Sequence, residues 1–158
     1  MRLAPEGTIQ RSDNALAGFP GALWTAVRPR EGFVSSLVCD PRDSATVYAT
    51  YATFGGAHVW KSTDGGTNWR SLDGAGATAL PDLPVHALAI DPRHPERLYL
   101  GTDLGVFVSL DGGATWTVED AGIPHVVTES FVVAPGPSGV SLFAFTHGRG
   151  VWKTQLPD

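Results

Sequence analysis

The sequence has 158 residues, of which 42% are hydrophobic and 17% charged, so one domain with a sizeable core is expected and simple disorder is excluded. The net charge of −5 excludes the basic surface that nucleic-acid binding needs, and no apolar run approaches a membrane span. The 19 glycines and 12 prolines leave little room for long helices. The single cysteine, Cys39, excludes an intrachain disulfide and a cysteine-built zinc site.

In chain order, the sequence predicts an N-terminal extension over residues 1–22 and a lone outer strand over 23–27, which contains Trp24. Three units of short strands follow over residues 33–73, 85–120 and 126–156. Asp-Pro and Gly-Gly dipeptides mark the turns between these strands. No segment has the periodicity of a helix.

The units are copies of one another. Ser62–Trp69 recurs as Ser109–Trp116 with matching strands upstream, whereas the third unit ends without such a segment. A repeat of roughly 40 to 50 residues with four strands is typical of a β-propeller blade. We therefore predict an all-β fold, a partial β-propeller of about three four-stranded antiparallel blades, with the third lacking its outer strand.

The repeated segments carry the pattern Ser-x-Asp-x-Gly-x-Thr-Trp, in which Asn68 replaces the threonine of the first copy. This is the Asp box, or bacterial neuraminidase repeat. The chain resembles Asp-box propellers, a group that includes sialidases, sortilin-type ectodomains, xyloglucan-cleaving glycoside hydrolases and photosystem assembly factors. Its ending resembles the last blade of larger bacterial proteins of this kind.

We call residues 62–69 and 109–116 the box hairpins. The resemblance places them between the third and fourth strands of a blade, on the face opposite the binding site. Aspartate and glycine suit a tight turn, but they also occur in calcium loops; both boxes lack the further oxygen ligands that calcium needs. We therefore assign a structural role to eight residues: Ser62, Asp64, Gly66, Trp69, Ser109, Asp111, Gly113 and Trp116.

The resemblance raises the question of glycoside hydrolysis. The Arg-Ile-Pro motif of sialidases is absent, which argues against sialidase activity by this chain. A xyloglucanase-type hydrolase needs two carboxylates that flank the scissile bond. The catalytic candidates on the loops opposite the boxes are Asp103 and Glu31. An Asx turn before Gly105 is the other interpretation of Asp103.

Four loop residues are candidates for ligand binding: Phe54, His125, His147 and Arg149. Phe54 has no counterpart in the shorter second-unit loop, and the two histidines are expected one blade junction apart. Trp152 is equivalent to Trp60 and Phe107, so it is expected in the core. No metal-ligand spacing and no cofactor motif are present.

The leading hypothesis is a catalytically incomplete propeller segment that binds glycan or protein. The alternative is a glycoside hydrolase that is active only with the missing blades. Open blade flanks predict either a homodimer that completes six blades or the remaining blades of a longer chain. The first residues lack the apolar stretch of a signal peptide, and full-length relatives are often secreted or periplasmic, so the compartment stays open.

Overall fold

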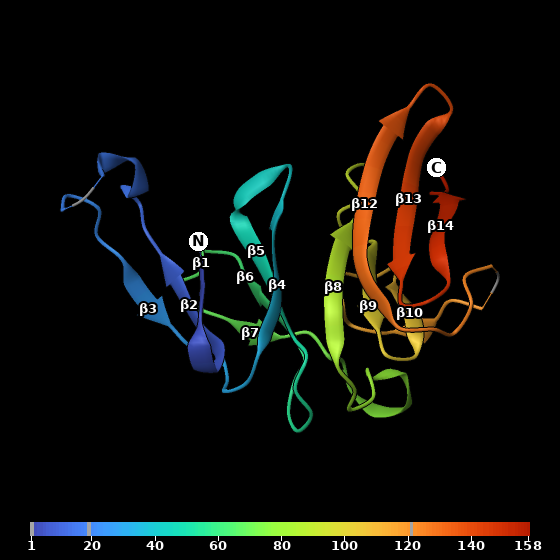
Figure 1. Cartoon of the computed structure of the whole chain (residues 1–158), viewed down its shortest axis with the longest axis horizontal. Coiled ribbons are helices and arrows are strands. Elements are labelled where there is room, and N and C mark those ends of the chain that lie inside the picture. Colours follow the sequence, from blue (N-terminus) through green and yellow to red (C-terminus); the bar gives the residue numbers. More distant parts are fainter. Residues whose placement is uncertain (1, 19, 121) are drawn as a thin grey trace.

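The computed structural model describes residues 2–18, 20–120 and 122–158. It contains four antiparallel sheets, drawn in Figure 1. The first holds β1 (Arg2–Ala4), β2 (Thr8–Arg11) and β3 (Thr25–Val27). The second holds β4 (Val34–Asp40), β5 (Asp43–Tyr51), β6 (Val59–Ser62) and β7 (Arg70–Ser71). The third holds β8 (Val85–Ile90), β9 (Leu98–Thr102), β10 (Gly105–Ser109) and β11 (Thr117–Val118). The fourth holds β12 (Thr128–Gly136), β13 (Gly139–Thr146) and β14 (Gly150–Gln155).

Helical structure in the described residues is confined to single 3-10 turns. These are η1 (Pro5–Gly7), η2 (Ala15–Ala17) and η3 (Gly76–Thr78). None of these helices is long and apolar enough to cross a membrane. The all-β prediction is therefore confirmed: short strands separated by turns make up the described chain apart from these 3-10 turns.

Each sheet is a meander in which neighbouring strands are also neighbours in sequence. The first strands of three successive sheets, β4, β8 and β12, lie side by side (Figure 1). The hydroxyl of Ser35 on β4 donates to the carbonyl of Val85 on β8 at 2.5 Å. This arrangement matches propeller blades, whose first strands line a common axis.

Apolar clusters fill the spaces between successive sheets. Between the second and third sheets, Val59, Leu72 and Leu100 form a core with Trp116. Between the third and fourth sheets, the core is built around Val106, Leu142 and Ala144, and a smaller cluster lies between the first and second sheets. Burial of one face of each sheet against the next is thus the main stabilising interaction.

The predictions for residues 1–27 are wrong in two respects. The strand of Trp24 is not a lone strand, since β3 pairs with β2 in the register Ile9↔Val27 and Arg11↔Thr25. The predicted extension also forms strands, because β2 pairs with β1. Ile9 is 1% exposed and packs in the cluster that contains Tyr51 of the second sheet, so this part is held by apolar burial. Phe19 of the predicted extension lies outside the described residues.

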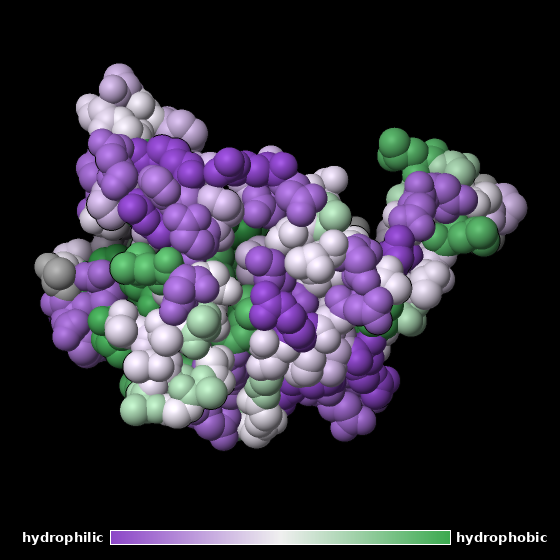
Figure 2. Space-filling view, turned by 180° about the vertical axis from the view of Figure 1, so that it is seen from behind, coloured by the Kyte–Doolittle hydropathy of each residue, from purple (hydrophilic) through white to green (hydrophobic). Residues whose placement is uncertain are grey.

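The prediction that Trp152 lies in the core is also wrong. Its side chain is 37% exposed on β14, whereas the equivalent Phe107 is 5% exposed. The reason is that β11 flanks β10, whereas no strand in the described part of the chain pairs with the outer edge of β14. In Figure 2, apolar surface is visible between polar regions over the C-terminal sheets and at the tip of the N-terminal part of the chain. Leu16 and Leu23, which precede β3, are exposed.

Candidate functional site

The box hairpins are closed by their own side chains. In the second one, Asp111 Oδ1 accepts hydrogen bonds from the backbone N–H groups of Ala114 and Thr115 and from the hydroxyl of Ser109. The same serine hydroxyl accepts from the N–H of Gly113 at 2.8 Å. The first hairpin repeats these bonds through Ser62 and Asp64. The geometry supports a structural role, since the carboxylate is saturated by groups of the turn itself.

These hydrogen bonds stabilise the charged form of both carboxylates. The pKa of Asp64 is lowered to about 2, chiefly by the backbone N–H of Asn68. The pKa of Asp111 is lowered to about 2, chiefly by the hydroxyl of Thr115. Both groups therefore stay ionised across the range of pH in which most enzymes work.

A third, stretched version of the same hairpin closes the N-terminal sheet. The hydroxyl of Ser12 donates to Oδ1 of Asn14, as the box serines donate to the box aspartates. The N–H of Asn14 donates back to the hydroxyl of Ser12. Asn14 Oδ1 then accepts the N–H of Leu23 at 2.8 Å, directly before Trp24. Sequence reasoning missed this hairpin because asparagine replaces aspartate and a long insertion separates the serine from the tryptophan.

The opposite end of the sheets carries the predicted catalytic candidates. Asp103 Oδ1 lies 2.7 Å from Nε2 of His86, so its carboxylate pairs with an imidazole rather than with its own turn. In that turn, the N–H of Leu104 bonds to the hydroxyl of Thr102 instead. Asp103 remains partly exposed, with 40% of its side chain accessible. Sequence reasoning missed His86, which lies at the irregularity in the β8–β9 register between Val85, the partner of Thr102, and Ala87, the partner of Gly101.

Glu31, the second catalytic candidate, is exposed and lies 3.4 Å from Arg28. It lines a groove of about 550 Å³ together with Arg30, Thr53 and residues 55–57. The Arg30 guanidinium crosses this groove, donates to the carbonyls of Ala57 and Phe54, and stacks 5.3 Å from the centre of the Tyr51 ring. Glu31, between β3 and β4, and Asp103, between β9 and β10, thus have different partners.

Phe54 lies beside this groove and is 62% exposed, in agreement with its predicted position on the surface. Phe33, which sequence reasoning did not single out, is 68% exposed on the adjoining segment. The N–H of Phe33 donates to the hydroxyl of Thr53 at 2.8 Å, which ties the two segments together. Two exposed aromatic rings therefore lie on neighbouring, hydrogen-bonded segments.

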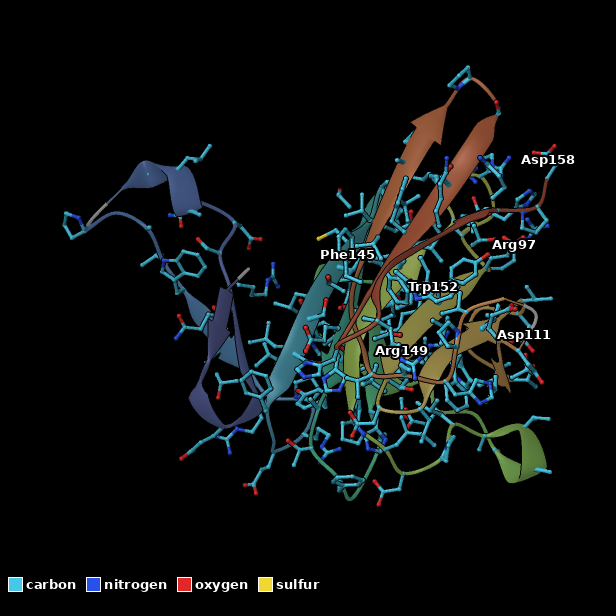
Figure 3. All side chains as sticks on the ribbon, turned by 45° about the vertical axis from the view of Figure 1, so that its right-hand side comes forward. Arg97, Asp111, Phe145, Arg149, Trp152 and Asp158 are labelled. Carbon is cyan, nitrogen blue, oxygen red and sulfur yellow. The ribbon has the colours of Figure 1, made fainter. Side chains whose placement is uncertain are left out.

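The remaining candidates lie on the fourth sheet and its entry loop. The His147 ring lies 3.0 Å from a Glu129 oxygen, and both side chains are exposed. His125 is exposed, and its backbone packs against Gly105 in the turn that follows Asp103. Arg149 lies in the β13–β14 turn, at the other end of β14 from Asp158 (Figure 3). The structure thus pairs His147 with a carboxylate rather than with His125.

A buried histidine supports the loops at this end. His58 is 1% exposed; its Nδ1 lies 3.2 Å from Asp73 and its Nε2 lies 3.1 Å from Asp82. Asp73 also accepts the N–H groups of His58 and Val59, and Asp82 accepts that of Gly55. The imidazole therefore connects the β5–β6 loop, which carries Phe54, to the β7–β8 loop. Across the described ranges, no group of three or more His, Cys, Asp or Glu residues has the geometry of a metal site.

Comparisons with known proteins agree with this architecture. No family model matches the chain. A xyloglucanase of Paenibacillus sp. is 27% identical over 143 residues, which cover 78% of this chain and 13% of that protein. The crystal structure of the GH74 xyloglucanase from Xanthomonas campestris superposes with a TM-score of 0.56 at 20% identity, covering 84% of this chain and 23% of that one. The crystal structure of an ancestral GH74 enzyme superposes with a TM-score of 0.56 at 24% identity, covering 75% of this chain and 14% of that one. The crystal structure of the Niastella koreensis GH74 enzyme superposes with a TM-score of 0.55 at 21% identity. This match covers 74% of this chain and 19% of that one.

The chain spans less than a quarter of the length of each of these relatives. The structural matches extend over most of the chain despite low identity. The protein has the fold of a partial β-propeller, similar to that of the GH74 structures on which it superposes.

Proposed function

We propose that this chain is a glycan-binding propeller segment that does not complete hydrolysis on its own, and that its ligand is a β-glucan chain of the xyloglucan type. The observation that carries the proposal is the pair of exposed rings, Phe33 and Phe54, beside the groove of Arg30. Aromatic rings offer sugars flat apolar faces, and the guanidinium and backbone groups beside them provide polar partners. The name of the Paenibacillus relative supports this choice of ligand.

Catalytic incompleteness is supported by the carboxylates. Glycosidases place two carboxyl groups about 5–5.5 Å or 6.5–9.5 Å apart across the scissile bond. Here Asp103 is paired with His86, and Glu31 lies beside Arg28 in the segment between β3 and β4. The two candidates therefore have separate partners and separate surroundings, which does not favour a joint acid–base role within this chain.

The test is a titration of the whole chain with xyloglucan oligosaccharides, in which binding is measured by calorimetry or NMR. We expect saturable binding that Phe54→Ala weakens at least tenfold, because the stacking ring is lost. The matched control is Phe145→Ala, which removes another exposed ring, on β13, away from the groove; it should bind as the wild type does. Absence of binding, or equal losses in both variants, would overturn the proposal.

A second function, glycoside hydrolysis once the missing blades are supplied, is favoured by the contact between Asp103 and His86. A partly exposed carboxyl group 2.7 Å from an imidazole nitrogen has the arrangement that an acid–base group needs. Release of reducing sugar from xyloglucan by the chain joined to the missing blades, abolished by Asp103→Asn, would replace the binding proposal with this one.

A further inference from the structure

A second groove lies between the third and fourth sheets, away from Arg30. Its volume is about 400 Å³, and both β10 and β14 contribute to its walls. Among its lining residues, Leu110 is 67% exposed and Trp152 is 37% exposed, whereas Val106 and Leu142 at its base are buried. Figure 3 shows Trp152 on the fourth sheet. The groove is therefore apolar and open along the outer edge of β14.

The corresponding space one sheet earlier is filled by a tryptophan. Trp116 is 4% exposed between the second and third sheets, and its indole N–H donates to the carbonyl of Leu72 at 2.7 Å. The backbone N–H of Trp116 donates to Thr78. This residue directly precedes the outer strand β11, so the strand and the indole are placed together.

The lining residues of the open groove are the repeat equivalents of those that surround Trp116. The N–H of Leu72 donates to Val59, and in the same way the N–H of Glu119 donates to Val106. The equivalent pairs, with the residue near Trp116 first, are Tyr48 and Tyr99, Val59 and Val106, Leu72 and Glu119, Leu98 and Leu142, and Phe107 and Trp152. The open groove is thus the same site, displaced by one sheet and without its indole.

The edge of β14 supplies the other half of the site. In the third sheet, β10 pairs with β11 through Phe107↔Val118 and Val108↔Thr117. Trp152 and Lys153 occupy the equivalent positions on β14 and are exposed. An exposed strand edge is a template for an added strand.

We propose that this groove binds a tryptophan-led outer strand, the second half of an Asp-box hairpin, supplied by a polypeptide segment other than residues 1–158. The indole enters the groove and donates its N–H to the backbone carbonyl of Glu119, as Trp116 does to Leu72. The residues after the tryptophan pair with Trp152 and Lys153. The bound strand completes the fourth sheet, and this inference does not depend on glycan binding.

A second copy of this chain is a poorer occupant. Each of its tryptophan-led strands already has a partner: β3 pairs with β2, β7 with β6 and β11 with β10. A copy would have to break its own sheet in order to donate one. The groove therefore fits a strand from another source.

The test measures binding of a fluorescein-labelled peptide of residues 111–120, which carries Trp116 and the outer-strand residues, to the whole chain by fluorescence anisotropy. We expect saturable binding and at least a tenfold loss when the tryptophan of the peptide is replaced by alanine, because aromatic anchors dominate such contacts. In the protein, Gly122→Phe should cause a similar loss. Gly122 lines the groove, and a Cβ there meets nothing within 4 Å, so a larger side chain is accommodated at the groove wall without a backbone clash.

Gly136→Phe is the matched control, since Gly136 lies at the β12–β13 turn and is absent from the groove lining. It should leave peptide binding unchanged, and both variants should keep the strand circular dichroism of the wild type. Equal binding of the alanine peptide, or equal affinity in Gly122→Phe, would overturn the proposal. Self-association of the chain that Gly122→Phe and Trp24→Ala both abolish would assign the groove to a second copy and overturn it as well.

Discussion

Asp64 and Asp111 show how a charged side chain serves as a turn element. Each carboxylate accepts backbone N–H groups and one serine hydroxyl within its own hairpin. Asn14 performs the same task at the N-terminal hairpin with a neutral amide. The comparison indicates that the oxygen acceptor is needed for the turn and that the charge adds stability that depends on pH.

The chain should lose stability in acid through these two carboxylates. Their pKa is lowered to about 2 in the folded protein, against roughly 3.9 for an unfolded aspartate. Because the folded pKa is the lower one, the contribution is complete above about pH 4 and is lost as the pH falls toward 2. We therefore expect the melting temperature to fall between pH 4 and pH 2.

The double variant Asp64→Asn, Asp111→Asn tests this cause. It keeps the acceptor oxygens, as Asn14 does, but removes the titration, so its melting temperature should depend less steeply on pH between 4 and 2. An unchanged slope in scanning calorimetry would show that other groups govern the acid transition.

At the residue scale, the sequence predicts side chains whose partners are local. The hydrogen bonds of the box hairpins join residues two to four positions apart, and so the roles of these residues could be inferred from spacing. The pair His86–Asp103 joins two strands, and the link from His58 to Asp82 joins two loops. Such contacts depend on strand register and loop path, which spacing along the chain does not specify.

Among the elements, the N-terminal sheet departs most from expectation. Two box hairpins at a regular interval made the second and third sheets predictable. In the first, the hairpin is stretched between Ser12 and Trp24, and its strands have only three or four residues. The pattern was therefore too short and too irregular to indicate strands before residue 23.

The N-terminal sheet should depend on the burial of Ile9. This side chain is 1% exposed and packs with Val34, Ala49 and Tyr51. Ile9→Ala removes buried methyl groups and leaves a cavity, so we expect a loss of about 2–5 kcal/mol in the free energy of unfolding, measured with urea. Hydrogen exchange of β1–β3 should accelerate at the same time.

Leu16→Ala is the control for this variant, because Leu16 is fully exposed in the same N-terminal region. Its effect should stay within about 0.5 kcal/mol. Equal stability of the two variants would mean that the first sheet is not anchored to the second through Ile9.

At the scale of the whole molecule, one end is left without an apolar partner. The fourth sheet packs one face on the third sheet through Leu142 and Ala144. On its other face, Val132 is 49%, Phe145 38% and Val151 54% exposed, and Phe145 faces Val151 across the β13–β14 register. In a propeller this face packs on the next blade, which agrees with the small share of each relative that the chain covers.

We therefore predict that the isolated chain self-associates through this open face. Its exposed valines and phenylalanine form a contiguous apolar surface, and surfaces of this kind mark interfaces. Static light scattering should give a mean mass above 16.7 kDa that rises with concentration. The double variant Val132→Thr, Val151→Thr lowers the apolarity of the face while keeping β-branched side chains that suit strands, so it should shift the chain toward the monomer with little change in strand content. A wild-type chain that stays monomeric at high concentration would contradict the prediction, because this apolar face would then remain exposed to solvent.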